Sequence, residues 1–347
     1  MTLQEAYKSR RKKRAIVFFS LVIVMFILLW ISLISGSSGV VWKDSLKFFD
    51  FANQERTFQV IIESIRLPRA LAAIFVGAML GLSGAVMQGV LRNPLASPFT
   101  LGVSQAAGFG AAVAIIVLPS FINENALFSQ FGVAICAFLF SMLCSFAILW
   151  ISSRVGMSPT SIILAGVGLG SLFHSGTMFL QFFTDEMNAA ATLFWTFGDL
   201  SKSNTLSLWI LCVVFSVLLF IFWLSHWKFD ALGFGDESAL NKGVNVDKFR
   251  KVTLILAAFC TSVGVSFFGI IGFIGLIAPH MVRMILGSNH AALLPLSALF
   301  GGVLLLGADL VARMLLYPAV LPVGILTSFI GAPLLLYLLV TLKRVQA

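Results

Sequence analysis

Charged side chains are scarce in this 347-residue chain. They make up 11% of it, whereas hydrophobic residues make up 59%. A soluble domain carries roughly 25% charged residues, so the chain lacks the polar groups needed to cover a globule of its size. The mean hydropathy is +1.01, and apolar segments recur along the whole length, so a single signal peptide does not explain them. Their unbroken runs favour membrane-spanning helices over the alternating pattern of a β-barrel.

Motifs for nucleotide binding, catalysis and metal binding are also missing. No G-x-x-x-x-G-K-[ST] sequence occurs, so the chain does not itself cradle ATP phosphates. The glycines in 166–170 lie inside an apolar run without a preceding strand, which indicates helix packing rather than a dinucleotide loop. The chain has only four histidines, and most acids lie in predicted loops, so no nucleophile, base and orienting group come together. We therefore expect no catalytic residue, no metal site and no cofactor bound by this chain.

The cysteines and the net charge have structural explanations. Four cysteines each lie inside an apolar run and form no C-x-x-C pair, which indicates small packing residues; they are Cys136, Cys144, Cys212 and Cys260. The net charge is +9, but six of the basic residues fall in Lys8–Arg14, directly before the first apolar run. This cluster indicates membrane topology and contact with lipid headgroups, so a nucleic-acid partner is not expected.

The apolar runs predict an all-α polytopic membrane protein of about ten transmembrane helices. The expected spans are 15–35, 67–91, one ending at Pro119, 128–151, 159–182, 206–224, 252–269, a broken piece ending at Arg283, 293–315 and 323–342. Most basic residues then lie on one side, which predicts that both termini are cytoplasmic in a bacterial inner (plasma) membrane. The expected organisation is a basic N-terminus (1–14) and a single transmembrane domain (15–342) that includes a long interior segment (226–251).

Two stretches broken by proline and glycine, 88–102 and 269–287, occur at matching places in the two halves. Interrupted segments at such places are typical of an inverted repeat, here of spans two to five and seven to ten. The halves share little identity, so two unrelated turns are an equal alternative. Small residues also recur at helical spacing, in pairs that allow close packing of helices in lipid; they are Gly77 with Gly81, Gly166 with Gly170, and Ala298 with Gly302.

Ionisable residues are rare inside the predicted spans. Asp309 and Arg313 are four residues apart, so they share one helix face and can pair with each other. His174 lies in the fifth span, where it either lines a pathway or is a hydrogen-bonded bundle residue. An ion-coupled secondary transporter needs a path of such groups, so this alternative has little support, and the energy source is expected outside this chain.

The interior segment 226–251 mixes charges of both signs with spaced apolar residues. Asp236 is expected to cap a short helix that Gly243 ends. A merely solvated loop would not need this regular apolar content, so we expect a docking element for a partner protein.

Several long motifs resemble the permease subunits of ABC importers for iron siderophores, haem and cobalamin (the FecCD type). They are Arg66–Ala72, Gly84–Pro98, Leu101–Gly108, Ile163–Val167, Gly272–Arg283, Ala308–Arg313 and Leu321–Pro333. The resemblance covers about residues 66–342 and implies a type II importer. Its implied partners are a second permease copy or paralogue, two ATPase subunits that use ATP and Mg, and an extracytoplasmic substrate-binding protein.

The resemblance also implies roles for particular residues. The interior segment would contact the ATPases through coupling residues Gly235, Asp236, Glu237, Leu240, Gly243 and Val244. Two turns would form a cytoplasmic gate, with Asn93, Pro94 and Leu95 in one and Ser158 and Pro159 in the other. The fifth span would line the path, with Gly166, Gly170 and His174 as candidate lining residues.

Three arginines are expected near the outer surface, against the positive-inside trend: Arg66, Arg69 and Arg313. They either form a basic patch for acidic residues of a binding protein, or they have local roles. In the local alternative Arg313 pairs with Asp309, and Arg66 and Arg69 extend to lipid headgroups. The resemblance favours docking. Whether the cargo is a ferric siderophore, ferric citrate, haem or cobalamin is left open by the sequence.

Overall fold

The structure is a computed structural model that describes residues 3–35, 60–118, 126–316 and 319–346. All regular elements in these ranges are helical. They are α1 (Leu3–Ile34), the π-helix η3 (Ile61–Arg66) that runs into α3 (Leu67–Leu91), α4 (Val103–Ala112) extended by the π-helix η4 (Val113–Val117), α6 (Ala126–Arg154), α7 (Pro159–Phe182), α8 (Glu186–Thr196), the 3-10 helix η5 (Leu200–Lys202), α9 (Thr205–Leu224), α10 (His226–Gly233), α11 (Asp236–Asn241), α12 (Val246–Phe268), α13 (Ile274–Leu286), α14 (His290–Leu315) and α15 (Val323–Gln346).

The described helices confirm an all-α membrane protein. Seven of them are long and apolar enough to cross a membrane, and three shorter apolar helices cover Val103–Val117, Ile274–Leu286 and Val323–Leu336. Together these elements correspond to the ten predicted spans. The helices Val103–Val117 and Ile274–Leu286 belong to the segments broken by glycine and proline, where backbone outside a helix must be enclosed by protein, whereas Val323–Leu336 is part of α15, which continues to Gln346.

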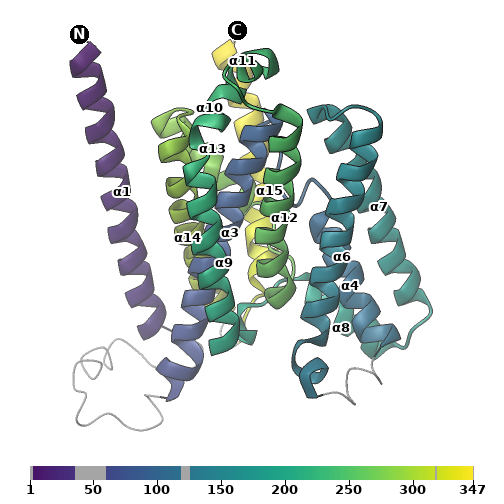
Figure 1. The fold of residues 1–347 in the computed structure, drawn as a ribbon. Coiled ribbons are helices and arrows are strands. Elements are labelled where there is room, and N and C mark those ends of the chain that lie inside the picture. The colour runs from purple at the N-terminus through teal and green to yellow at the C-terminus, as the bar shows by residue number, and fades with distance from the viewer. Residues whose placement is uncertain (1–2, 36–59, 119–125, 317–318, 347) are drawn as a thin grey trace.

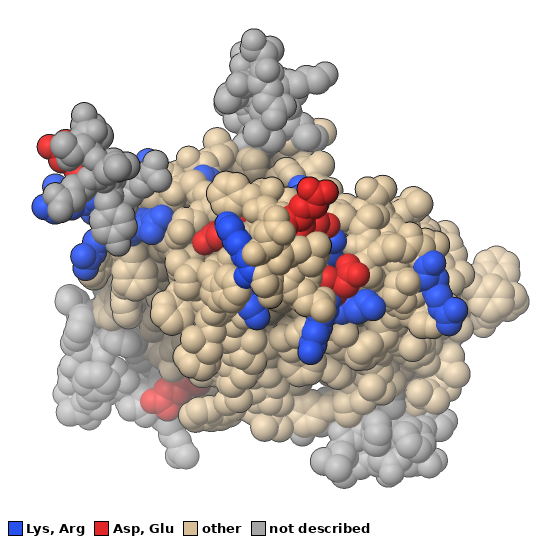
Figure 2. All heavy atoms as spheres, turned by 45° about the horizontal axis from the view of Figure 1, so that its top comes forward, with Lys and Arg blue, Asp and Glu red and all other residues tan. Residues whose placement is uncertain are grey.

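The helices form one bundle, with both chain ends at the end that carries α10 and α11 (Figure 1). We call this end the inner end and the opposite one the outer end. Figure 2, with the inner end turned forward, shows charged side chains gathered there above a flank that is nearly free of them. This distribution fits a helix bundle whose flank faces lipid.

Helix α3 forms the centre of the bundle and packs closely on α14. A Cβ at Gly77 would lie 2.3 Å from the Gly301 carbonyl oxygen, and one at Gly81 would lie 2.2 Å from that of Ser297. Only glycine permits this approach of the two backbones, as the small-residue spacing predicts for Gly77 and Gly81. Gly166 and Gly170 likewise pack against Leu101 and Gly102.

The structure corrects several sequence-based boundaries. Helix α1 begins at Leu3, so the basic cluster is helical and continuous with the first span. The second span is helical from before Arg66, because η3 precedes it. Two helices outside the spans, α8 and α10, were not expected. The predicted outer stretch 36–65 lies largely outside the described residues.

The order of helix lengths is similar in the two halves. Helices α3, α4, α6 and α7 have 25, 10, 29 and 24 residues, and α12, α13, α14 and α15 have 23, 13, 26 and 24. In each half a long helix is followed by a non-helical break and a short helix. The inverted repeat stays a prediction with which this order agrees.

Candidate functional site

A cavity of about 810 Å³ opens between α4, α7, α8 and α15. Its wall is mostly apolar, with scattered polar side chains that include Gln105, His174, Thr177, Gln181 and Ser328. No Asp, Glu, Lys or Arg within the described ranges lines it. Such a wall accommodates a bulky solute without holding it through charge.

The structure places His174 at this cavity, and its side chain is exposed in the single chain. A smaller neighbouring groove of about 350 Å³ is lined by His174, Gly166 and Gly170. The two glycines are buried against the turn that ends at Gly102. All three predicted lining residues therefore border an open space, and their role in transport stays a prediction.

The first inner turn follows α3. Arg92 ends the helix in the left-handed conformation, with φ of 47°. The Asn93 side-chain oxygen accepts a hydrogen bond from the Leu95 amide at 2.9 Å, which closes an Asx turn around Pro94. Leu95 is exposed at the inner end. This local bonding explains why helix α3 ends here and the chain continues as a turn.

The second inner turn precedes α7. Ser158 is the N-cap of that helix and accepts a hydrogen bond from the Ser161 amide at 3.1 Å. Pro159 occupies the first helical position, where its missing N–H costs nothing. Met157, directly before the cap, is buried, so its carbonyl is available to a partner within the protein.

The interior segment contains two short helices, α10 and α11, instead of one. Gly235, with φ of 110°, is the N-cap of α11, and Asp236 is the first helical residue. The prediction that Asp236 caps the helix is therefore wrong by one position, because its carboxylate binds elsewhere. Gly243, with φ of 80°, follows the end of α11, as the sequence predicts.

The Asp236 carboxylate lies between two arginines. Its Oδ1 is 3.1 Å from Arg92 Nη2 and 2.8 Å from Arg250 Nη2. Arg250 is buried, and its Nη1 donates to the Met157 carbonyl at 3.2 Å. Arg92 adjoins the first inner turn and Met157 adjoins the second. One carboxylate of α11 is therefore connected to both turns, and we call these four residues the inner network.

Helix α10 is anchored separately. The Asp230 carboxylate accepts hydrogen bonds from His290 at the start of α14, 2.9 Å from the backbone nitrogen and 2.7 Å from Nδ1. Burial acts to raise the pKa of Asp230, but the His290 bonds outweigh it, so the pKa lies below its usual value. The carboxylate is thus stabilised as an anion that fixes the interior segment to the bundle.

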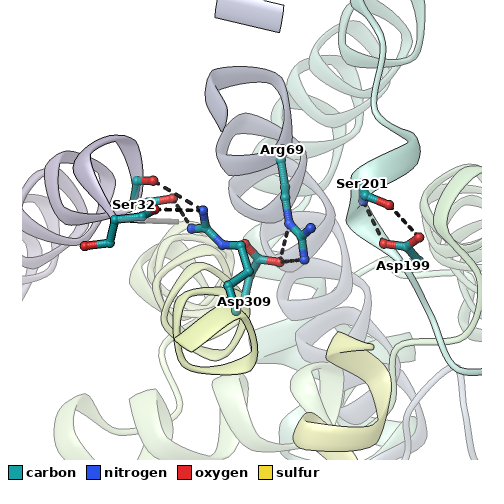
Figure 3. A network of polar contacts seen from close by, with 7 residues as sticks. Ser32, Arg69, Asp199, Ser201 and Asp309 are labelled. Carbon is teal, nitrogen blue, oxygen red and sulfur yellow. Dashed lines mark hydrogen bonds and ion pairs between the residues drawn. The ribbon is translucent and has the colours of Figure 1, made fainter. Parts of the chain in front are cut away.

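A second carboxylate shared by two arginines lies near the outer end. Asp309 Oδ1 is 2.8 Å from Arg69 Nη2, and Asp309 Oδ2 is 3.0 Å from Arg313 Nε. Arg313 Nη2 also donates to the Ser32 hydroxyl of α1, so the cluster joins α1, α3 and α14 (Figure 3). We call Ser32, Arg69, Asp309 and Arg313 the outer network.

This geometry corrects the expectation of an exposed basic patch. Arg66, Arg69 and Arg313 are all buried. The pairing of Arg313 with Asp309 is confirmed, but Arg69 also pairs with Asp309 instead of reaching lipid. Arg66 donates to the carbonyls of Leu33 and Ile34, each at 2.8 Å. These contacts indicate a structural role, and docking of a binding protein through the arginines stays a prediction.

Comparison with known proteins agrees with this architecture. Residues 23–341 match the FecCD transport family. The chain belongs to the FecCD transport family. This FecCD protein is 36% identical to the Fe(3+)-citrate import permease YfmE of Bacillus subtilis, over 95% of this chain and 97% of that one. It is 40% identical to the cobalamin import permease BtuC of Halobacterium salinarum, over 82% of this chain and 74% of that one.

A solved structure shows the same fold at a TM-score of 0.80 and 32% identity, covering 94% of this FecCD chain and 99% of its own. It is described as an inward-facing conformation of an ABC transporter of metal-chelate type. The resemblance of the sequence motifs to importer permeases is therefore confirmed. This chain is a transmembrane permease subunit of an ABC importer.

Sequence reasoning missed Arg92 and Arg250 of the inner network. Both were visible as basic residues, but no local pattern shows that they meet one carboxylate. Their partners come from different helices, and Arg92 is far from Asp236 along the chain. Only the burial of Arg250 inside α12, which the fold shows, indicates that a pairing partner must exist. Metal-binding groups of three or more suitable side chains do not occur among the described residues.

Proposed function

We propose that this FecCD permease imports an iron chelate (a ferric siderophore or ferric citrate), haem or cobalamin into the cytoplasm. The relatives named for ferric citrate and cobalamin, and one named for hemin transport in Yersinia pestis at 36% identity, support this cargo class. The wide cavity without charged lining fits bulky solutes of differing structure. We propose that the inner end, with both termini, faces the cytoplasm.

The proposed complex has two permeases, two ATPase subunits that bind ATP and Mg, and an extracytoplasmic binding protein. The 810 Å³ cavity is not enclosed, and the helices α7 and α15 that line it carry exposed apolar residues such as Phe182 and Phe329. A second copy or a close paralogue on this side would complete the wall of the path. Membrane lipid would cover the remaining apolar flank.

We propose that α11 and its flanking residues receive the movement of the ATPase. Phe234 and Leu240 are 77% and 57% exposed at the inner end, beside an open groove of about 620 Å³ lined by Gly235, Glu237, Ser238, Asn241 and Lys242. Exposed apolar anchors beside charged groups are typical of protein-docking surfaces. Gly243 lies at the end of this surface, and Val244 is buried next to it.

The observation that carries the coupling proposal is the inner network. A displacement of α11 must move, stretch or break the contacts from Asp236 to Arg92 and, through Arg250, to Met157. Asn93, Pro94 and Leu95 follow Arg92, and Ser158 and Pro159 follow Met157. The two predicted gate turns would therefore respond together to one displacement of the interior segment.

Reconstituted transport tests the proposal. Proteoliposomes that contain the permease and its ATPases, with the binding protein outside, should take up a ferric chelate only with internal ATP. An uncoupler should leave the uptake unchanged. ATP-independent uptake that collapses with the uncoupler would instead establish an ion-coupled transporter.

The docking role of α11 is tested in the same vesicles. Leu240→Asp places a charge on the proposed ATPase contact and should abolish transport-linked ATP hydrolysis while the permease still inserts. Asn204→Asp is the matched control, because it adds the same charge away from α11 while Asp serves equally well as the N-cap of α9. Equal coupling in both variants would show that α11 is a solvated segment.

A further inference from the structure

A groove of about 360 Å³ lies at the inner end on the flank of the bundle, away from the large cavity. It is bounded by the end of α9, by α10, and by the turn and first helical turns of α12. Its lower wall is apolar and includes Ile221 and Val252, both exposed. The rest of α9 presents exposed apolar residues such as Val213, Val217 and Phe220 on the flank. The groove therefore opens where a lipid-facing surface meets the charged inner end.

Two lysines lie at the polar end of this groove. Lys228 Nζ is 5.5 Å from the ring centre of Trp227 and 5.6 Å from that of Phe249, so the aromatic rings hold the ammonium group in place. Lys248, on α12, also lines the groove. The ion pairs between described residues include neither lysine. The groove therefore holds two positive charges without a protein carboxylate as partner.

Neutral hydrogen-bond donors line the same groove, and the acidic residues near it lie outside it or are bonded elsewhere. Ser225 and Asn245 line the groove. Asn245 Oδ1 accepts the Lys248 amide, and the hydrogen bonds between described residues include no donation by the Ser225 hydroxyl or the Asn245 amide nitrogen. Asp247 is next to Lys248 in sequence, but it does not line the groove. Asp230, on α10, is engaged by His290. The free groups are thus two cations and two neutral donors, which suit a phosphate.

We propose that this groove binds the headgroup of an anionic phospholipid of the inner leaflet. The phosphate would lie between Lys228 and Lys248, and an acyl chain would follow the apolar wall at Ile221 and Val252. Trp223 and Trp227, both exposed, flank the groove as residues of an aromatic interfacial belt. Basic pockets between helices on the cytoplasmic side are places where anionic lipid headgroups bind. A soluble anion would need the lysines but not the apolar wall.

The position of the site gives it a consequence for the interior segment. Gly243 and Val244, which close α11, also line the groove, and the helix that supplies Lys248 supplies Arg250 of the inner network. A bound lipid would therefore hold the start of α12 at the membrane surface, next to the contact with Asp236. The lipid site itself does not depend on the proposed transport function.

Native mass spectrometry of the purified permease tests the site. The protein is released from nanodiscs of phosphatidylcholine that contain a minor fraction of phosphatidylglycerol. The wild-type chain should retain phosphatidylglycerol in preference to phosphatidylcholine. The double variant Lys228→Gln/Lys248→Gln should lose this preference by about 25-fold, since each lysine near an anionic lipid contributes about a factor of five.

Matched variants and competitors make the result specific. Lys242→Gln removes a lysine that lies over Phe234, outside the groove, and should leave retention unchanged, whereas Lys228→Arg/Lys248→Arg should keep it and show that charge is required. Equal retention by the Gln double variant would overturn the proposal. So would displacement of the lipid by inorganic phosphate at equal concentration, which identifies a soluble-anion site. Complete displacement by the ATPase subunits would also overturn it, because the groove would then be a protein contact.

Discussion

The inner and outer networks are built alike but lie in different surroundings. In each, one carboxylate is shared by two arginines from different parts of the chain. The side chain of Asp309 is 0% exposed, whereas that of Asp236 is 38% exposed. The outer network joins three long helices, and the inner network joins a short helix to two turns. The same chemical unit is thus built around a fully buried carboxylate at one end and a partly exposed one at the other.

Burial explains this difference. Removing one member of a buried ion pair leaves an uncompensated charge in a medium that solvates it poorly. In the inner network Asp236 and Arg92 are each 38% exposed, so water can replace this contact at small cost, whereas Arg250 is buried and depends on Asp236 as its counter-charge. The outer network is therefore expected to set stability, and the inner network is expected to set the response to the ATPase.

The largest expected effect is at Asp309. Asp309→Asn leaves Arg69 and Arg313 buried without a counter-charge and should destabilise the protein by about 3–5 kcal/mol. Thermal unfolding of the detergent-purified permease, followed by tryptophan fluorescence, measures this loss. Asp236→Asn is the matched change in the exposed network, and an equal fall in Tm for both variants would refute the distinction between the networks.

A smaller effect is expected at Arg250. Arg250→Gln removes the hydrogen bond to the buried Met157 carbonyl and one ion pair, at a cost of about 1–3 kcal/mol for the carbonyl left without a donor. Arg92 still pairs with Asp236, so the first inner turn should stay connected while the second is released. The same unfolding experiment gives the stability loss, and crosslinking at the two turns would separate their responses. A synchronous response of both turns would count against Arg250 as the connection.

Asp236→Asn should destabilise the protein less than Asp309→Asn, because the Asp236 carboxylate and Arg92 are partly exposed and only Arg250 is left buried without a counter-charge. Its effect should appear in coupling: basal ATP hydrolysis continues, but stimulation by the loaded binding protein and transport both fall. Asp236→Glu keeps the charge and should recover part of the coupling. Full coupling in the Asn variant would show that the ion pairs are incidental.

Salt is expected to have the smallest effect. Charges at the surface are screened over about 8 Å at physiological ionic strength and over about 3 Å at 1 M, whereas buried pairs are screened much less. Raising the salt concentration should therefore weaken the Arg92–Asp236 contact and lower coupling. The unfolding temperature of the wild-type protein, which depends on the buried outer network, should stay nearly unchanged. Transport and Tm, both measured over one salt series, test this difference in salt dependence. A parallel decline of both quantities would contradict it.

The sequence predicted the spans well because membrane helices are specified locally. The fifth span, 159–182, coincides with α7, since Pro159 begins it and no other signal competes. Helix α8 was missed because its start depends on Asp185, whose side chain accepts the Asn188 amide in a loop that reads as polar. Contacts between distant residues carry no local signal. Arg69 and Asp309 are 240 residues apart, so only the fold shows that these arginines are buried and paired.

We expect Asp236 to transmit movement of α11 to the inner turns. Cysteines at Asn93, introduced into two paired permeases whose four native cysteines are replaced by alanine, report the distance between the first turns of the two copies. With Asp236 present, the crosslink yield should differ between the nucleotide-free complex and the ATP-bound complex. With Asp236→Asn, ATP should still bind but the yield should no longer change. An equal nucleotide-dependent change in both proteins would contradict the claim.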